Sequence, residues 1–163
     1  MLKTGFARID ITPPMGVTLA GYPTIRLADG ILDPLFATAV AFDDCEKRAV
    51  VISVDVIGMN MEFMSLLRPA VAKAIDTEID GVFISCTHTH TGPAVAATGV
   101  TKETFPNPGY GDWLIRRIAD TAVMAFSDLA PAKLLYTRGE ADDVAHIRRF
   151  RMRTEVYAQI RDI

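Results

Sequence analysis

The chain has 163 residues, which is close to the usual size of one domain and long enough for one substantial hydrophobic core. Half of its residues are hydrophobic and 23% are charged, a balance that is typical of globular proteins and excludes an intrinsically disordered chain. The formal net charge of −3 argues against nucleic acid as a partner, because phosphate binding needs clustered lysine and arginine side chains. No apolar run approaches the roughly 20 residues that a helix needs to cross a bilayer, so we expect no transmembrane segment.

Two features of the chain favour a cytoplasmic location. The two cysteines, Cys45 and Cys86, can form neither a disulfide framework nor a four-cysteine zinc site, so we expect both to be reduced thiols. The first six residues include Lys3 but no apolar segment of the kind that a secretory signal peptide contains. We therefore predict a cytoplasmic protein without a signal peptide.

The first part of the chain predicts three strands, a tight turn and one long loop. The first strand ends where Pro13 and Pro14 remove two backbone donors from the ladder. The loop is rich in turn-forming residues, and loops of this length inside a domain are often functional. The third strand is almost continuously apolar, as expected for a strand covered on both faces. These strands span residues 5–11, 34–42 and 48–56, with the loop over 15–33 and the turn at 43–44.

From residue 60 onward, helical patterns alternate with strands. Asn60 is the expected N-cap of the first helix, and Pro69 inside this helix is expected to kink it or delay its regular part. The second helix has an apolar stripe at helical spacing, formed by Leu114, Ile118, Ala122, Ala125 and Leu129. The helices span residues 60–76 and 110–129, and the strands span residues 81–86, 133–137 and 146–152. This order predicts an α/β fold, a layered sandwich with a mixed β-sheet flanked by helices.

Two of the three histidines, His88 and His90, stand two residues apart just after a predicted apolar strand. In an extended chain such residues project from the same face, with Cα atoms roughly 6.5–7 Å apart. They could converge on one zinc ion, or one could bind zinc while the other hydrogen-bonds the reacting group. A hydrogen-bonded structural pair at a strand end is the alternative. The threonines that alternate with the histidines could fix an imidazole tautomer and favour the metal site.

Residues 82–93, VFISCTHTHTGP, closely resemble the strand and THTHSGP motif of the neutral/alkaline, non-lysosomal ceramidase family. Four other segments are similar to motifs of that family in the same order, and Thr38 stands where the family usually has arginine. The resemblance covers about residues 4–153. The similar segments are GFARIDITPP at residues 5–14, AGY at 20–22, DPLFATA at 33–39 and VISVD at 51–55.

The resemblance implies a zinc-dependent amide hydrolase, with Zn2+ activating a water that attacks an N-acyl C–N bond. His88 aligns with the first zinc ligand of the family. His90 aligns with the second histidine of the motif, which lies beside the metal and assists the reaction. The implied substrate is a small-molecule or lipid-like N-acyl compound. Ceramide itself would place the protein in sphingolipid metabolism, but nothing in the sequence encodes an acyl-chain pocket.

The other zinc ligands of the family, a histidine, a glutamate and a tyrosine, lie far downstream of the motif. His146 is the only histidine after His90 and comes too early, so we interpret it as a structural residue. The sequence therefore holds one half of a metal site. Three explanations stay open: the sequence is a fragment, chain is missing between Arg153 and Thr154, or the protein has lost the chemistry.

We divide the chain into residues 1–153, the N-terminal part of a ceramidase-like catalytic domain, and residues 154–163, a segment of uncertain placement. Two other functions stay open beside amide hydrolysis. The protein could be a degenerate, non-catalytic family member that binds or assembles, including as a homo-oligomer, or it could be a metal-dependent esterase.

Three further residues could contribute to a site. Asp55 is either a carboxylate that orients a histidine or a turn-forming residue. Asp10 is expected to accept hydrogen bonds in a turn rather than to bind metal. Tyr22, in the long loop, is expected either to line the pocket or to pack as an ordinary aromatic residue.

Overall fold

The computed structural model describes residues 1–95 and 108–141. The chain divides into a first unit, Met1–Lys133, and a second unit, Leu134–Ile163. All helices and strands of the described residues lie in the first unit. Among the described residues, no helix is long and apolar enough to cross a membrane.

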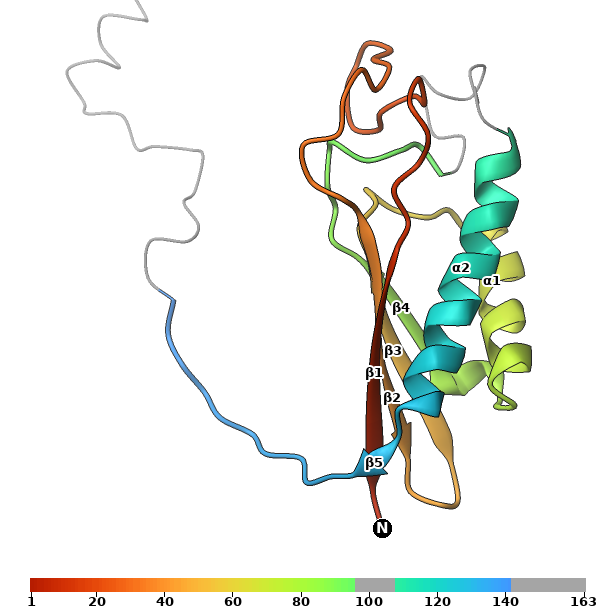
Figure 1. Ribbon diagram of the computed structural model, residues 1–163, viewed down its shortest axis with the longest axis vertical. Coiled ribbons are helices and arrows are strands. Elements are labelled where there is room, and N and C mark those ends of the chain that lie inside the picture. Colours follow the sequence, from red (N-terminus) through yellow and green to blue (C-terminus); the bar gives the residue numbers. More distant parts are fainter. Residues whose placement is uncertain (96–107, 142–163) are drawn as a thin grey trace, which may run out of the picture. The chain divides into compact units, whose positions relative to one another are not determined.

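Five strands of the first unit form one mixed sheet in the order β4-β3-β2-β1-β5 (Figure 1). Strands β3 and β4 are parallel, and the other neighbouring pairs are antiparallel. The α/β class with a mixed sheet is therefore confirmed. The strands are β1 (Lys3–Asp10), β2 (Phe36–Asp43), β3 (Arg48–Val54), β4 (Val82–Cys86) and β5 (Ala130–Pro131).

Helices α1 (Met61–Ala74) and α2 (Pro108–Ser127) pack on the same face of this sheet (Figure 1). Asn60 is the N-cap of α1, as predicted, because its side chain accepts a hydrogen bond of 2.8 Å from the backbone N–H of Phe63. The helix continues through Pro69 and ends five residues later. The predicted apolar stripe of α2 is confirmed for Leu114, Ile118, Ala122 and Ala125, which are fully buried. The helix ends at Ser127, so Leu129 lies beyond it and packs against the core while partly buried.

The other face of the sheet carries no helix within the described part of the chain, and side chains from four strands line up across it. Phe6, Val40, Val51 and Phe83 are register partners from β1 to β4. Phe6, Val51 and Phe83 are exposed, with Phe83 at 62%. The prediction that the third strand is covered on both faces is therefore wrong for the described residues, because α1 and α2 both lie on the opposite face.

The predicted strand over residues 133–137 is also wrong. Of residues 130–141, only Ala130 and Pro131 pair with β1, and no strand follows them up to residue 141. Leu134, Leu135 and Tyr136 are all exposed, and no strand of the described residues pairs with them. An apolar segment without a partner strand is not stabilised as a strand. The predicted strand over residues 146–152 lies outside the described residues.

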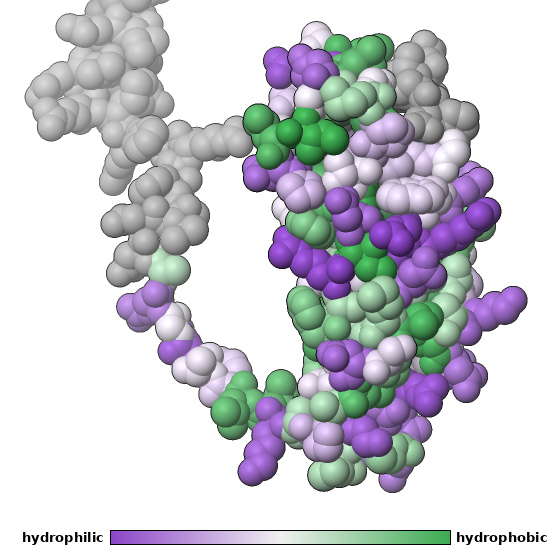
Figure 2. Space-filling model, in the orientation of Figure 1, coloured by the Kyte–Doolittle hydropathy of each residue, from purple (hydrophilic) through white to green (hydrophobic). Residues whose placement is uncertain are grey.

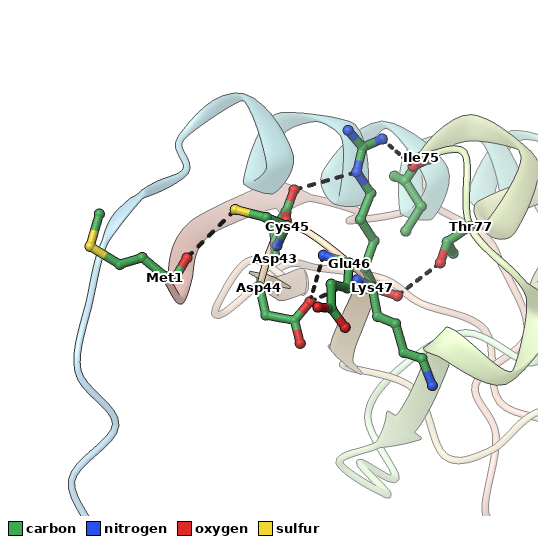
Figure 3. A network of polar contacts seen from close by, with 9 residues as sticks. Met1, Asp43, Asp44, Cys45, Glu46, Lys47, Ile75 and Thr77 are labelled. Carbon is green, nitrogen blue, oxygen red and sulfur yellow. Dashed lines mark hydrogen bonds and ion pairs between the residues drawn. The ribbon is translucent and has the colours of Figure 1, made fainter.

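Hydrogen bonds from the backbone to two carboxylates hold the turn between β2 and β3 (Figure 3). One oxygen of Asp44 accepts from the N–H groups of Lys47 at 2.7 Å and Glu46 at 2.9 Å, and these bonds lower the pKa of Asp44. Asp43 accepts from the N–H of Cys45, whose φ of 78° lies in the left-handed region. The turn therefore closes at residues 43–47 and includes the predicted residues 43–44.

The sheet brings several loops together at one end. The register pairs Asp10 with Phe36, Ala37 with Val54, and Val54 with Cys86. The end of β1, the start of β2 and the ends of β3 and β4 therefore lie at the same end of the sheet. The loops that continue from these strands lie together at that end of the sheet (Figure 1). They are residues 11–35, 55–60 and 87–95.

Candidate active site

The histidine-containing segment begins where β4 ends and continues along the end of β3. The N–H of Thr87 donates to the carbonyl of Val54 at 3.0 Å, and the N–H of His88 donates to the carbonyl of Val56 at 3.1 Å. These two bonds fix the segment against a strand that is neighbouring in the sheet but distant in sequence. The backbone of His88 has a φ of 63°, a left-handed conformation that non-glycine residues rarely adopt. Such strained residues occur preferentially at functional sites.

The imidazole of His88 is oriented by a backbone carbonyl. Its Nδ1 lies 2.7 Å from the carbonyl oxygen of Ile57. A carbonyl oxygen can only accept, so Nδ1 carries the proton and donates it. In the neutral ring, Nε2 is then left with its lone pair available. The sequence suggested that neighbouring threonines fix the tautomer, but the residue that does so is Ile57.

The ring of His90 lies beside that of His88, although not for the predicted reason. The two ring centres are 5.1 Å apart, and the ring planes are inclined by 68°. The predicted extended geometry is wrong, because the left-handed backbone of His88 interrupts it. Tyr22, from the long loop, packs against His90 with ring centres 6.3 Å apart and planes nearly perpendicular. The two imidazoles are therefore close together, and one of them contacts the loop.

The long loop over residues 15–33 is attached to the histidine segment by backbone pairing. Leu19 forms an isolated β-bridge with Pro93, and the N–H of Ala20 donates to the carbonyl of Gly92 at 3.0 Å. The N–H of Ala94 donates to the carbonyl of Thr18 at 2.9 Å. The loop is thus held on both sides of this contact and forms one wall of the site.

A cavity of about 670 Å³ lies between the loop and the histidine segment. Three threonines that alternate with the histidines line it, Thr87, Thr89 and Thr91, together with Tyr22 and the half-buried Asp55. Neither histidine lines this cavity; Tyr22 is the residue that both lines it and contacts His90. Most of the rest of the lining is apolar and comes from the loop and the residues that flank it: Pro13, Pro14, Met15, Val17, Leu19, Ile31, Leu32 and Leu35.

The loop that lines this cavity carries several exposed apolar side chains. Met15, Ile31 and Leu32 are exposed, and Leu32 is fully so. Hydrophobic side chains gather at this end of the first unit (Figure 2). Arg26 adds one cationic group, which lies over the ring of Tyr22 at 4.2 Å from its centre. The loop therefore offers an apolar surface beside the histidines, a feature that the sequence pattern did not indicate.

The other candidate residues have structural partners. The carboxylate of Asp55 accepts from the N–H of Phe36 at 2.9 Å, and the N–H of Asp55 donates to the carbonyl of Phe36, which continues the β2–β3 pairing. Within the described residues this carboxylate has no hydrogen bond to a histidine, and Asp55 lies in a bend, as the turn-forming alternative predicted. Asp10 accepts from the N–H of Thr12 at 2.7 Å, which confirms the predicted turn acceptor. The side-chain and backbone hydrogen bonds of Thr12 lower the pKa of Asp10.

Among residues 1–95 and 108–141, no group of three histidine, cysteine or carboxylate side chains is placed to hold a metal ion. His146 lies outside the described residues. Both cysteines lie within them and are unpaired, and burial raises the pKa of the Cys86 thiol. The described part of the chain thus supplies the His88 and His90 pair and no complete ligand set.

Two solved structures share the fold of most of this chain. One is a neutral ceramidase from Pseudomonas aeruginosa, and the other is a ceramidase complexed with C2. Each aligns with 80% of this chain at a TM-score of 0.64 and 20% sequence identity. The chain spans 22% of the length of those proteins. A search against models of known protein families finds no match. The chain therefore has a ceramidase-like fold.

Proposed function

We propose that the protein is a zinc-dependent hydrolase of amide C–N bonds in N-acyl, ceramide-like compounds. His88 is the proposed zinc ligand, and His90 is the proposed catalytic residue. The observation that carries this proposal is the 2.7 Å hydrogen bond between Nδ1 of His88 and the carbonyl of Ile57. Histidines that bind metals usually donate their second N–H to a carbonyl or carboxylate in this way, which fixes the tautomer and the ring orientation.

The donor set at this position fits zinc in part. Nε2 of His88 has the free lone pair with which an imidazole binds zinc, and this exposed ring is reachable from solvent. Catalytic zinc normally has three protein ligands and an open position, so the remaining ligands must come from outside the described residues. When bound, zinc would polarise the scissile carbonyl and lower the pKa of an attacking water.

His90 would handle the proton of the reaction. Its ring lies beside the proposed ligand and has no hydrogen-bond partner within the described residues. Its Nδ1 faces Gly21, so Nε2 is the nitrogen that would meet a substrate. A histidine in this position could take a proton from the attacking water and pass it to the leaving nitrogen, or donate a hydrogen bond to the developing oxyanion. The packing of Tyr22 against it would keep the ring in place.

The apolar cavity supports a substrate with an apolar acyl group. Its lining is built mainly from aliphatic and proline side chains of the long loop, while the threonines provide hydroxyl groups on the side of the histidine segment. Binding sites for small molecules commonly combine an apolar lining with a few polar groups. The lining carboxylates, Asp29, Asp33 and Asp55, and the guanidinium group of Arg26 would contact the polar part of such a substrate.

A substrate panel tests this function in the protein expressed from its complete reading frame. Matched N-acyl amides and O-acyl esters with the same head group should be compared, each with a short and a long acyl chain. We expect amide hydrolysis that is faster for the long chain, is abolished by a chelator and returns on addition of zinc. Ester hydrolysis alone would favour a metal-dependent esterase. No hydrolysis by fully zinc-loaded protein would favour the non-catalytic alternative.

A further inference from the structure

The His90 ring is in direct contact with the backbone of Gly21. A Cβ atom built on Gly21 would lie 2.5 Å from Nδ1 of His90, 2.6 Å from its Cγ and 2.8 Å from Cδ1 of Ile57. Carbon and nitrogen atoms that are not bonded do not approach this closely, since optimal separations between carbon atoms are about 3.5–4.0 Å. The imidazole can therefore occupy its place only because residue 21 has no side chain.

Backbone pairing holds the loop at this contact, whereas the His90 ring belongs to an exposed side chain. The bridge between Leu19 and Pro93 and the bond from Ala20 to Gly92 hold the loop immediately before Gly21. The ring is bounded by Tyr22 and by the imidazole of His88. Ile57 contacts the same point and also orients His88 through its carbonyl. A side chain at position 21 would therefore push the imidazole of His90 out of its present orientation.

We propose that Gly21 is a positioning residue for His90, setting the direction in which this imidazole faces the substrate. The proposal rests on the proposed amide hydrolysis, but its geometric part concerns the two residues alone. A displacement of about 1 Å at a catalytic group can reduce a rate on the order of a hundredfold. The three atoms nearest to the added Cβ belong to His90 and to the side chain of Ile57, and none belongs to His88, so we expect the main effect on the chemical step and not on metal binding.

The chain offers a control that separates this contact from backbone strain. Gly21 has a φ of 88° and Gly16 has a φ of 82°, so alanine is similarly strained at both positions. An added Cβ at Gly16 meets nothing within 4 Å, however. Gly16→Ala therefore reports the backbone strain alone, and Gly21→Ala reports the strain together with the collision with His90.

The kinetic test uses both variants in the full-length zinc-loaded protein. Gly21→Ala should lower kcat about a hundredfold with KM and zinc content little changed, whereas Gly16→Ala should stay within a few-fold of the parent protein. A Gly21→Ala variant as active as Gly16→Ala would overturn the proposal. A variant that lost zinc and activity together would also overturn it, because Gly21 would then act through the metal site.

A second test does not depend on catalysis and uses the coupling between the two residues. Gly21→Ala should lower the Tm of the parent protein by more than Gly16→Ala does. His90→Ala removes the ring but leaves Ile57, so this excess loss of Tm should become smaller in the His90→Ala background. If Gly21→Ala alone failed to fold, the double variant should fold. A Tm loss that is identical with and without His90 would show that the contact is not made. If this coupling were found in a protein without amide hydrolysis, the proposed function would fail while the contact stood.

Discussion

Replacing His88 by alanine is expected to remove most of the zinc from the full-length protein. Near-stoichiometric zinc in the parent should fall well below half, because one of about four ligands is lost. Amide hydrolysis should fall on the order of a thousandfold, since metal polarisation supplies several kcal/mol to such reactions. Elemental analysis of protein purified without chelator measures the zinc, and the same preparation gives the rate.

Two matched variants show whether this loss comes from the imidazole. Alanine is strained at the φ of 63° that His88 adopts, but asparagine tolerates this conformation. His88→Asn removes the imidazole without this backbone strain, and it should lose zinc just as His88→Ala does. Thr87→Ala changes the neighbouring exposed residue and should keep its zinc. Unchanged zinc in both His88 variants would remove this residue from the metal site.

Replacing His90 by alanine is expected to separate catalysis from metal binding. The variant should retain much of its zinc while amide hydrolysis falls on the order of a hundredfold or more, because a positioned general acid or base is lost. Parallel measurements of zinc content and rate in the parent and both histidine variants provide the comparison. Equal zinc loss in His88→Ala and His90→Ala would make His90 a second ligand instead.

Local patterns in the sequence were sufficient for most of the first unit. The helical spacing that begins at Leu114 predicted the buried stripe of α2, and Asn60 marked the start of α1. These features depend on residues a few positions apart, whose relation is set by helix geometry. Which face of β3 packs against a helix could not be predicted in the same way, because a run of apolar residues such as Val50 and Val51 does not indicate on which face a helix will lie.

The site depended on contacts that no local pattern contains. The left-handed backbone of His88 and its bond to Ile57 follow from pairing between the ends of β3 and β4, and the strand alternation before it predicted an extended chain instead. The contact of Gly21 with His90 joins residues far apart in sequence. One signal was available for it: Gly21-Tyr22 belongs to a segment that resembles the ceramidase family, and a glycine in such a place often allows close approach of another group.

The central claim is that Nε2 of His88 binds zinc while its Nδ1 donates to Ile57. Anomalous X-ray diffraction at the zinc absorption edge, from crystals of the full-length protein, tests this most directly. We expect an anomalous peak about 2.0–2.1 Å from Nε2 of His88, with the Ile57 hydrogen bond intact and the His90 ring beside the metal but not bound to it. A peak on Nδ1 of His88, or zinc bound elsewhere with His88 free of metal, would contradict it.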